Sequence, residues 1–319
     1  MIEVQGLTKD YGVHRAIHNL NFTVAKGDVV GFLGPNGAGK STTMKIITGF
    51  MAPSSGIAKI AGFDVFENPI EVKKRIGYLP ENPPVYGDMT VQDYLKYVAQ
   101  LKKVSKNKIP AHVQMAIEKT NLQSVAKKLI QNLSKGFKQR VGIAQALVSD
   151  PEILILDEPT VGLDPKQVAE VRNLIQQLKG QHTIILSTHI LSEVEATCQK
   201  VIIINKGEIV AQDLIQNLGQ ASKSQSKLFI KTLKPVADFK AALAGLTGVT
   251  SFTPGLSAFE WNLALDGGED LISEVASRLI KSGHGLLELK PERMDLEDVF
   301  LKLTYERNEK SEHSVAANV

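Results

Sequence analysis

The chain has 319 residues, of which 43% are hydrophobic and 22% charged, and its formal net charge at pH 7 is +3. This size predicts one large domain and a smaller one, and the nearly balanced charge does not favour a nucleic-acid-binding protein. The longest apolar runs, such as VIII at 201–204, are much shorter than the roughly 20 residues that span a bilayer, and the single cysteine, Cys198, excludes an intrachain disulfide.

The first 220 residues alternate short apolar runs with helical stretches. The segment MIEVQGLTKD has a strand-like alternation and lacks the basic and apolar segments of a signal peptide, so we expect a cytoplasmic protein. The later apolar runs predict an α/β domain with a mainly parallel, buried sheet; they are VVGFLG, RIGYLP, EILILDE, HTIILSTH and VIIINKGEIV. No comparable run occurs between residues 82 and 150, which predicts a helical insertion.

A second, smaller domain is predicted after residue 220. The stretch GQASKSQSK is small and polar, which is typical of a linker, and we place this linker at 221–227. Residues 228–305 contain strand and helix patterns in the order β-α-β-β-α-β, as in a small ferredoxin-like α+β domain. The polar segment 306–319 is expected to be a flexible tail.

A phosphate-binding loop is predicted at GPNGAGKST. It contains the pattern G-x-x-x-x-G-K-[ST], follows an apolar strand and precedes a helical pattern, which an accidental glycine-rich turn does not explain. The glycines let successive backbone N–H groups point at phosphates, Lys40 supplies a positive charge, and Ser41 offers its hydroxyl to Mg²⁺. The predicted nucleotide-binding residues of this loop are Gly34, Pro35, Asn36, Gly37, Ala38, Gly39, Lys40, Ser41 and Thr42.

Two further predicted strands end in side chains suited to the same site. The strand ILILDE ends in adjacent carboxylates, and because successive side chains of a strand point to opposite faces, we assign Asp157 to the metal shell and Glu158 to a water in line with the γ-phosphate. His189 ends the strand TIILSTH at the same sheet edge, where it is expected to sense the γ-phosphate and orient the water. Lys40, Glu158 and His189 are the predicted catalytic residues.

The stretch LSKGFKQR predicts the first turn of an amphipathic helix that ends before Pro151. Ser134 is a good N-cap, and Gly136 lets another surface approach the backbone closely. The free N–H groups and the positive end of the helix dipole indicate an anion site. An ordinary serine-capped helix is an equally common explanation of this stretch.

The order of GPNGAGKST, a helical insertion, LSKGF, ILILDE, VGLD and STH closely resembles that of the ATP-binding subunits of ABC transporters, from residue 1 to about 220. The resemblance implies a P-loop NTPase fold, ATP and Mg²⁺ as cofactors, and ATP hydrolysis coupled to transport. It also implies a head-to-tail dimer, expected to be a homodimer, in which Ser134 and Gly136 of one subunit cap the ATP held by the other. Tyr11 would then stack on adenine, Asp164 would link the two sites, and His189 would be the switch histidine.

Three positions depart from the family pattern. Lys135 and Phe137 replace the first glycine and the glutamine of the usual signature, and we expect the site still to close on ATP, with Lys135 either adding charge near phosphate or pointing to solvent. Glu81 replaces the usual glutamine that senses Mg²⁺ and touches the transporter. A carboxylate still ligates Mg²⁺, but it adds negative charge beside Asp157 and Glu158, so closure should depend more strongly on the metal.

GYLPEN, LSKGFKQR and the C-terminal segment DLEDVFLKLT resemble the ATPases of ABC-2-type exporters, including those of gliding-motility and copper-site-maturation systems. This resemblance implies a separate membrane permease that docks near Glu81 to Tyr94, and a location on the cytoplasmic face of the plasma membrane. A rigid loop without a partner is the other explanation of the prolines there. The alternative function is a soluble ABC-type ATPase acting on nucleic acid or ribosomes, but neither long heptad arms nor a second phosphate loop occurs.

Overall fold

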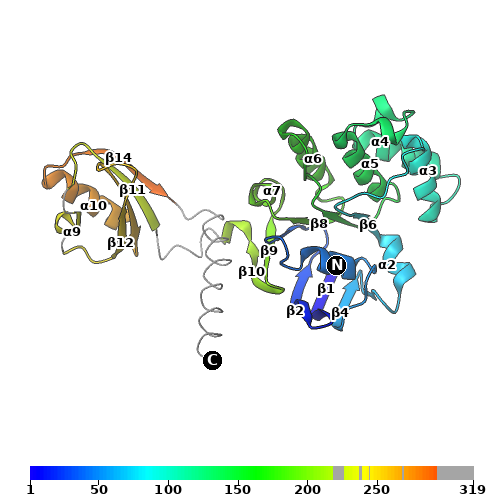
Figure 1. Cartoon of the computed structure of the whole chain (residues 1–319), viewed down its shortest axis with the longest axis horizontal. Helices are drawn as coiled ribbons and strands as arrows, with labels where there is room; N and C mark the ends of the chain where they lie inside the picture. The colour runs from blue at the N-terminus through cyan, green and yellow to red at the C-terminus, as the bar shows by residue number, and fades with distance from the viewer. Residues whose placement is uncertain (218–225, 237–238, 244, 268, 293–319) are drawn as a thin grey trace. The chain divides into compact units, whose positions relative to one another are not determined.

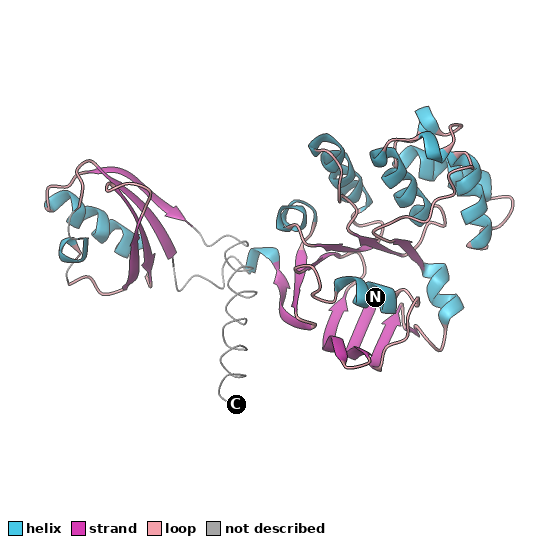
Figure 2. Ribbon diagram, in the orientation of Figure 1, coloured by secondary structure: helices cyan, strands magenta, loops and turns pink. Residues whose placement is uncertain are grey.

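A six-stranded sheet forms the centre of the N-terminal part of the chain, in the order β10-β9-β3-β8-β7-β6 (Figures 1 and 2). The neighbours from β9 to β6 are parallel, and β10 pairs antiparallel with β9 at one edge, which confirms the predicted mainly parallel sheet. The bounds are β3 Val29–Leu33, β6 Ile76–Leu79, β7 Ile153–Asp157, β8 Thr183–Thr188, β9 Lys200–Asn205 and β10 Glu208–Leu214.

Both faces of the central strands of this sheet are buried, because β3, β7 and β8 are buried at every position. In β7, Ile153 and Ile155 join a core cluster that includes helix α1 (Lys40–Ile47). The intervening Leu154 and Leu156 join a second cluster with helices α5 (Lys135–Leu147) and α6 (Pro165–Leu178). Packing on both faces of the sheet therefore fixes the position of the strand ends. The polar residues that directly follow the strands are positioned by the same packing.

A second, antiparallel sheet lies against α1 and has the order β2-β1-β4-β5. Its strands are β1 Ile2–Tyr11, β2 His14–Val24, β4 Ser55–Ile60 and β5 Phe63–Asp64. The alternation of buried and exposed residues along β1 and β2 reflects burial of one face. The sequence predicted a strand at the N-terminus but not this separate sheet.

The predicted helical insertion is present. It contains α3 (Val91–Leu101), α4 (Ile109–Lys119) and α5, with short 3₁₀ turns at Gln123–Val125 and Ile130–Asn132, and its helices share a hydrophobic cluster. Helix α2 (Pro69–Arg75) precedes β6. Helix α5 begins after Ser134, whose side chain accepts a hydrogen bond from the backbone N–H of Phe137 at 3.4 Å, so the helix and its N-cap are as predicted.

The computed structural model describes residues 1–217, 226–236, 239–243, 245–267 and 269–292, and the chain divides into the units Met1–Leu214 and Ile215–Val319. The second unit has an antiparallel sheet in the order β12-β13-β11-β14, which with its two helices is the ferredoxin-like β-α-β-β-α-β arrangement. Its elements are β11 Ser226–Thr232, α9 Phe239–Ala242, β12 Val249–Pro254, β13 Glu260–Leu265, α10 Glu269–Lys281 and β14 Leu286–Glu292.

The predicted tail 306–319 and most of the predicted linker lie outside the described residues, and β11 begins two residues before the predicted start of the second domain. Within the described ranges, no helix combines the length and apolar character that a bilayer crossing requires.

Candidate active site

The loop between β3 and α1 surrounds the amine of Lys40. Gly39 has a left-handed φ of 103° at the N-cap of α1, a conformation that favours glycine and turns the chain directly into the helix. The Lys40 side chain is only 6% exposed, and its Nζ donates to the carbonyl oxygens of Gly34 at 2.8 Å and Pro35 at 3.3 Å. Burial lowers the pKa of Lys40, and the negative charge of Glu158 is the largest opposing effect.

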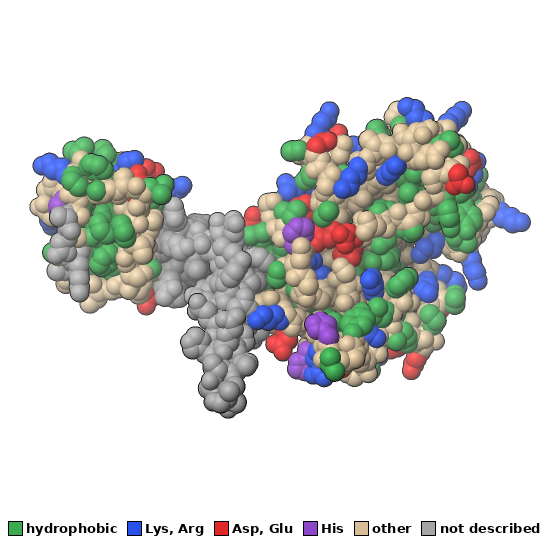
Figure 3. Space-filling view, viewed as in Figure 1, with side chains coloured by type: hydrophobic (Ala, Val, Ile, Leu, Met, Phe, Trp, Pro, Cys, Tyr) green, Lys and Arg blue, Asp and Glu red, His purple; other side chains and the backbone are tan. Residues whose placement is uncertain are grey.

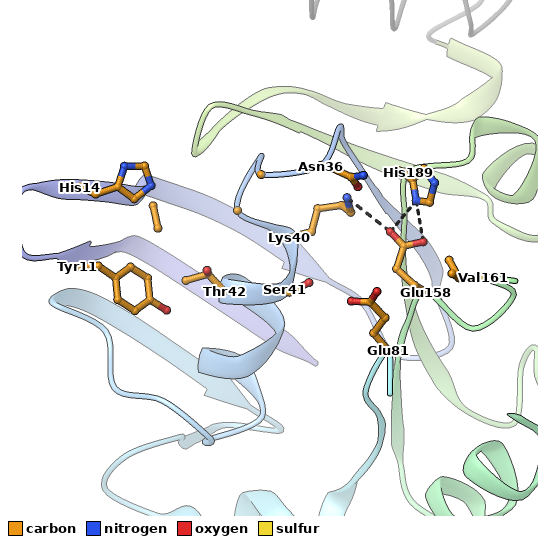
Figure 4. Close-up of a pocket in the computed structure, with 13 residues that line it drawn as sticks. Tyr11, His14, Asn36, Lys40, Ser41, Thr42, Glu81, Glu158, Val161 and His189 are labelled. Carbon is orange, nitrogen blue, oxygen red and sulfur yellow. Dashed lines mark hydrogen bonds and ion pairs between the residues drawn. The ribbon is translucent and has the colours of Figure 1, made fainter. Parts of the chain in front are cut away.

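Glu158 and His189 meet at the ends of two neighbouring strands, β7 and β8. Nδ1 of His189 lies 3.0 Å from each carboxylate oxygen of Glu158, and the amine of Lys40 lies 3.6 Å from Oε1 (Figure 4). Glu158 has a left-handed φ of 49°, which is strained for a residue with a side chain, and its N–H donates to the carbonyl of Ser187 at 2.8 Å. This turn directs the carboxylate into the cavity.

Asp157 occupies a separate, more enclosed position one residue earlier. Its Oδ1 accepts a hydrogen bond from the hydroxyl of Ser187 at 2.7 Å, and the hydroxyl of Ser41 also hydrogen-bonds this carboxylate. Burial raises the pKa of Asp157, the two hydroxyls lower it, and the charges of Glu158 and Glu81 raise it further. An enclosed carboxylate beside a serine hydroxyl is an all-oxygen donor set, which fits Mg²⁺.

Lys40, Ser41, Glu158 and His189 line one cavity of about 560 Å³, whereas Asp157, Gly34, Pro35 and Ala38 are not among its lining residues. Lys40, Glu158 and His189 lie at one end, and Tyr11 and His14 lie at the other, beyond Thr42 (Figure 4). The predicted site residues that line the cavity are Tyr11, Asn36, Gly37, Gly39, Lys40, Ser41, Thr42, Glu81, Glu158 and His189. On the visible surface of this unit a group of acidic side chains lies near the middle, and lysine and arginine side chains are scattered over the face and along its edge (Figure 3).

Three lining residues, His14, Ala16 and Val161, were not predicted. The β1–β2 hairpin pairs Tyr11 with His14, so a two-residue turn at Gly12 and Val13 was the sequence signal that would have placed them together. The ring of Tyr11 is 45% exposed, and its hydroxyl lies 2.9 Å from Sδ of Met51. This leaves the Tyr11 ring accessible at the end of the cavity away from Lys40.

Ser134 and Gly136 do not line this cavity, although both lie in the described part of the chain. Within the chain, the group that approaches Gly136 closely is the amide end of the Gln167 side chain, which extends from α6. Asp164 also lies outside the cavity; it caps α6 by accepting a hydrogen bond from the N–H of Gln167 at 2.9 Å. The structure therefore separates these three residues from the phosphate loop of their own subunit.

The two unusual signature residues have distinct surroundings. The amine of Lys135 lies against Gly162, where an added Cβ would overlap it, so this side chain reaches toward the segment VGLD. Phe137 packs against the core of the helical insertion, and the guanidinium of Arg140, paired with Glu170, lies 5.4 Å from the centre of its ring. Phe137 thus has a packing role at the start of α5.

A glycine-rich loop between a strand and a helix, with a lysine in the loop and carboxylates at the end of a neighbouring strand, defines a P-loop NTPase. A profile of the ABC transporter family matches residues 17–161, and one described as an AAA domain, putative AbiEii toxin, matches residues 129–195. The chain is 33% identical over 306 residues to the uncharacterized ABC transporter ATP-binding protein YxlF of Bacillus subtilis (strain 168), covering 96% of this chain and 100% of that protein.

Two other comparisons cover about two thirds of the chain. The bacitracin transport ATP-binding protein BcrA of Bacillus licheniformis is 41% identical over 214 residues, covering 66% of this chain and 69% of that protein. The dimeric structure of MJ0796, a bacterial ABC transporter cassette, is 25% identical with a TM-score of 0.62, covering 67% of this chain and 98% of that one. The chain belongs to the family of ABC transporter ATP-binding proteins, and its activity is ATP hydrolysis.

Proposed function

We propose that this protein is the ATPase subunit of an ABC-2-type exporter and works as a head-to-tail dimer beside a separate membrane permease. The observation that carries the ATPase part is the convergence of Lys40, Glu158 and His189 at one end of the cavity, with an exposed aromatic ring at the other end. The motifs GYLPEN and LSKGFKQR support the exporter subgroup. The name of BcrA, a transport ATP-binding protein, is consistent with this assignment.

In this proposal each lining group has one task. Tyr11 stacks on adenine, and the loop N–H groups with Lys40 bind the triphosphate and neutralise its charge. Glu158 accepts the proton of the attacking water, because its carboxylate is turned into the cavity and is the group closest to His189. His189 holds the carboxylate and orients the water.

Ser41 and Asp157 would hold Mg²⁺, since their oxygens already contact one another and Asp157 is buried in this position. A Mg²⁺ ion held by these two residues would supply positive charge against the negative charge that develops during phosphoryl transfer. Glu81 lines the same cavity and influences the pKa values of Lys40 and Asp157, which supports a place for it at the edge of the metal shell. Its additional negative charge should make nucleotide binding more dependent on the metal.

The dimer is proposed because the signature helix does not reach the cavity of its own subunit. Ser134 caps α5 at an exposed position, and the dipole of a 13-residue helix favours an anion there. A head-to-tail partner would bring the γ-phosphate of its ATP to this N-terminus. Asp164 would then link the two sites through its position at the start of α6, and the similarity to a dimeric cassette supports the arrangement.

A permease surface is proposed on the helical insertion, next to Glu81. Tyr86 is 51% exposed, and its ring packs edge-on against Tyr94 at 6.1 Å and Tyr97 at 5.8 Å. Leu101, at the end of α3, is 63% exposed. Tyr94 is buried, whereas Tyr86, Tyr97 and Leu101 present apolar surface on the helical insertion. Such a surface is suited to an apolar helix of a membrane subunit, which would hold the protein at the cytoplasmic face of the membrane.

The test is the variant Glu158→Gln, which keeps the size of the side chain and removes the proton acceptor. We expect hydrolysis to fall by about 100-fold or more while ATP affinity is retained, so that ATP and Mg²⁺ accumulate a stable dimer. Turnover is measured by phosphate release, and molar mass by light scattering with and without ATP. Glu152→Gln, an exposed carboxylate just before the same strand, is the matched control and should hydrolyse ATP at the native rate.

A native rate in Glu158→Gln would contradict the assignment of the base. An inactive variant that binds ATP but stays monomeric would contradict the head-to-tail dimer of this chain alone. Chelation of Mg²⁺ should abolish the dimer, and substitution of Glu81 by Gln should reduce that metal requirement.

A further inference from the structure

The helix α7 (Leu191–Thr197) carries a buried carboxylate that does not line the nucleotide cavity. Glu193 is only 2% exposed. Its Oε1 accepts a hydrogen bond from the hydroxyl of Thr160, and its Oε2 accepts one from the hydroxyl of Thr188 at 3.0 Å. Both threonines are themselves buried, so the two hydroxyls replace water for this carboxylate.

The carboxylate of Glu193 is not needed to hold α7 on the sheet. The neighbouring Val194 packs directly on β3 at Gly31, where a Cβ would lie 2.5 Å from the valine Cγ1, so α7 already has an apolar contact with the sheet. A buried carboxylate is costly unless it is hydrogen-bonded, and an apolar residue of similar size would fill the same space without that cost. The presence of a carboxylate with two hydroxyl donors at this position therefore indicates a role other than packing of the helix.

The two threonines belong to the two segments that carry the catalytic pair. Thr160 follows Glu158 by two residues, and Thr188 directly precedes His189. Thr188 Oγ1 also accepts the N–H of Ile190 at 3.1 Å, which fixes the turn that follows the strand. One carboxylate thus joins the segment that follows β7 to the end of β8, and these two segments carry Glu158 and His189.

We infer that Glu193 is a positioning residue for ATP hydrolysis, which holds Glu158 and His189 in register through Thr160 and Thr188. The inference rests on the roles proposed above for that pair. Glu158 has a strained backbone, and strained residues persist only where neighbouring contacts determine their conformation. Thr160 also begins the segment that leads to Asp164, so the same hydrogen bond fixes the start of the proposed contact with a partner subunit.

The experiment compares Glu193→Ala with its partner variant Thr160→Val in the full-length protein. We expect kcat to fall by about tenfold to 100-fold in Glu193→Ala, because a small displacement of a catalytic group is sufficient for such a loss, while the Kd for ATP stays within about threefold. Thr160→Val should also lower kcat and leave the Kd for ATP unchanged, but its loss of kcat should be smaller. The double variant should be no slower than Glu193→Ala alone, because both changes remove one interaction.

Two conservative variants and one control complete the test. Glu193→Gln retains an acceptor oxygen and places an amide donor near the second hydroxyl, so it should recover kcat to within about threefold of the native value. Thr160→Ser keeps the donor and should do the same. Glu195→Ala, an exposed carboxylate two residues along α7, should leave both kcat and Kd unchanged.

A native kcat in Glu193→Ala, beside an inactive Glu158→Gln, would overturn this inference alone. A native kcat in Glu158→Gln would instead overturn the proposed roles on which it rests. If Glu193→Ala does not fold, Thr160→Val decides, since valine has the shape of threonine: a native kcat there would refute the positioning role. Equal losses of kcat and ATP affinity in Thr160→Val would also refute it, because they would indicate general disruption of the fold.

Discussion

At the scale of single residues, the site is governed by charges that are removed from water and held close together. Lys40 is buried among loop carbonyls and lies 3.6 Å from Glu158, and its pKa is lowered by burial and raised by three carboxylates. The amine donates hydrogen bonds to the backbone carbonyl oxygens of Gly34 and Pro35. Triphosphate oxygens would replace these neutral carbonyls with charged acceptors, which make stronger hydrogen bonds. Lys40 should therefore contribute a large part of the free energy of ATP binding.

Replacement of Lys40 by Met is therefore expected to impair binding and chemistry together. Met retains the apolar stem but removes the charge and its donors, so we expect the Kd for ATP to rise by about tenfold or more and kcat to fall by about 100-fold. Fluorescent-nucleotide titration and phosphate release measure the two effects. Lys45→Met, at an exposed position of the same helix, is the control; an unchanged Kd in Lys40→Met would show that the loop N–H groups alone determine affinity.

At the scale of elements, short helices beside the sheet are stabilised by local ion pairs. In α2, Glu71 pairs with Lys74 at 2.6 Å and with Arg75 at 2.8 Å, and these contacts lower its pKa from the ordinary 4.5 to about 2. Because the folded-state pKa is depressed, the stabilising effect is fully present above pH 4.5 and is lost as the pH falls toward 2. The group is exposed, so salt should screen much of the effect.

Glu71→Gln is expected to lower the urea midpoint slightly at pH 7. The difference from the native protein should shrink as the pH falls below 4.5 and should also shrink in high salt, because both conditions remove the ion pairs from the native protein itself. Urea unfolding followed by circular dichroism at several pH values measures this. Glu67→Gln, an exposed glutamate just before α2, is the control, and a difference independent of pH would contradict the electrostatic origin.

The sequence predicted those elements whose pattern is set locally. Strands buried on both faces, such as β7, have continuous apolar runs, and α5 has a capping serine and helical periodicity, so both were predicted from residues alone. The separate sheet containing β1 and β2 was missed, because alternation indicates a strand with one buried face but not its partners.

In the site, too, residues within one local motif could be predicted, and residues brought together by tertiary packing could not. Lys40 and Ser41 belong to one contiguous motif and could be placed from the sequence. His14 and Val161 enter the cavity only because of how hairpins and loops pack, and Glu193 lies on a helix with no motif around it. Its contacts with Thr160 and Thr188 join segments that are brought together by the sheet, and no local pattern specifies them.

At the scale of the whole molecule, the chain consists of two units with separate hydrophobic cores. The three core clusters of the first unit contain residues up to Ile209, and the cluster of the second unit begins at Leu228. All residues that line the nucleotide cavity come from the first unit. We therefore propose that residues 1–220 are the ATPase domain and 228–305 an accessory domain, as the sequence indicated.

Because the two cores are separate, the first unit should fold without the second. A fragment ending at residue 217 should fold and bind ATP with a Kd within about threefold of the full chain, because it retains every cavity residue and each buried cluster around them. Its melting temperature should lie within about 5 °C of the first transition of the full-length protein. Calorimetry and nucleotide titration measure both quantities, with the full-length chain as control.

A fragment that is unfolded, or that loses affinity by more than about tenfold, would mean that the first unit depends on the second for its stability, and the two-domain division would have to be abandoned.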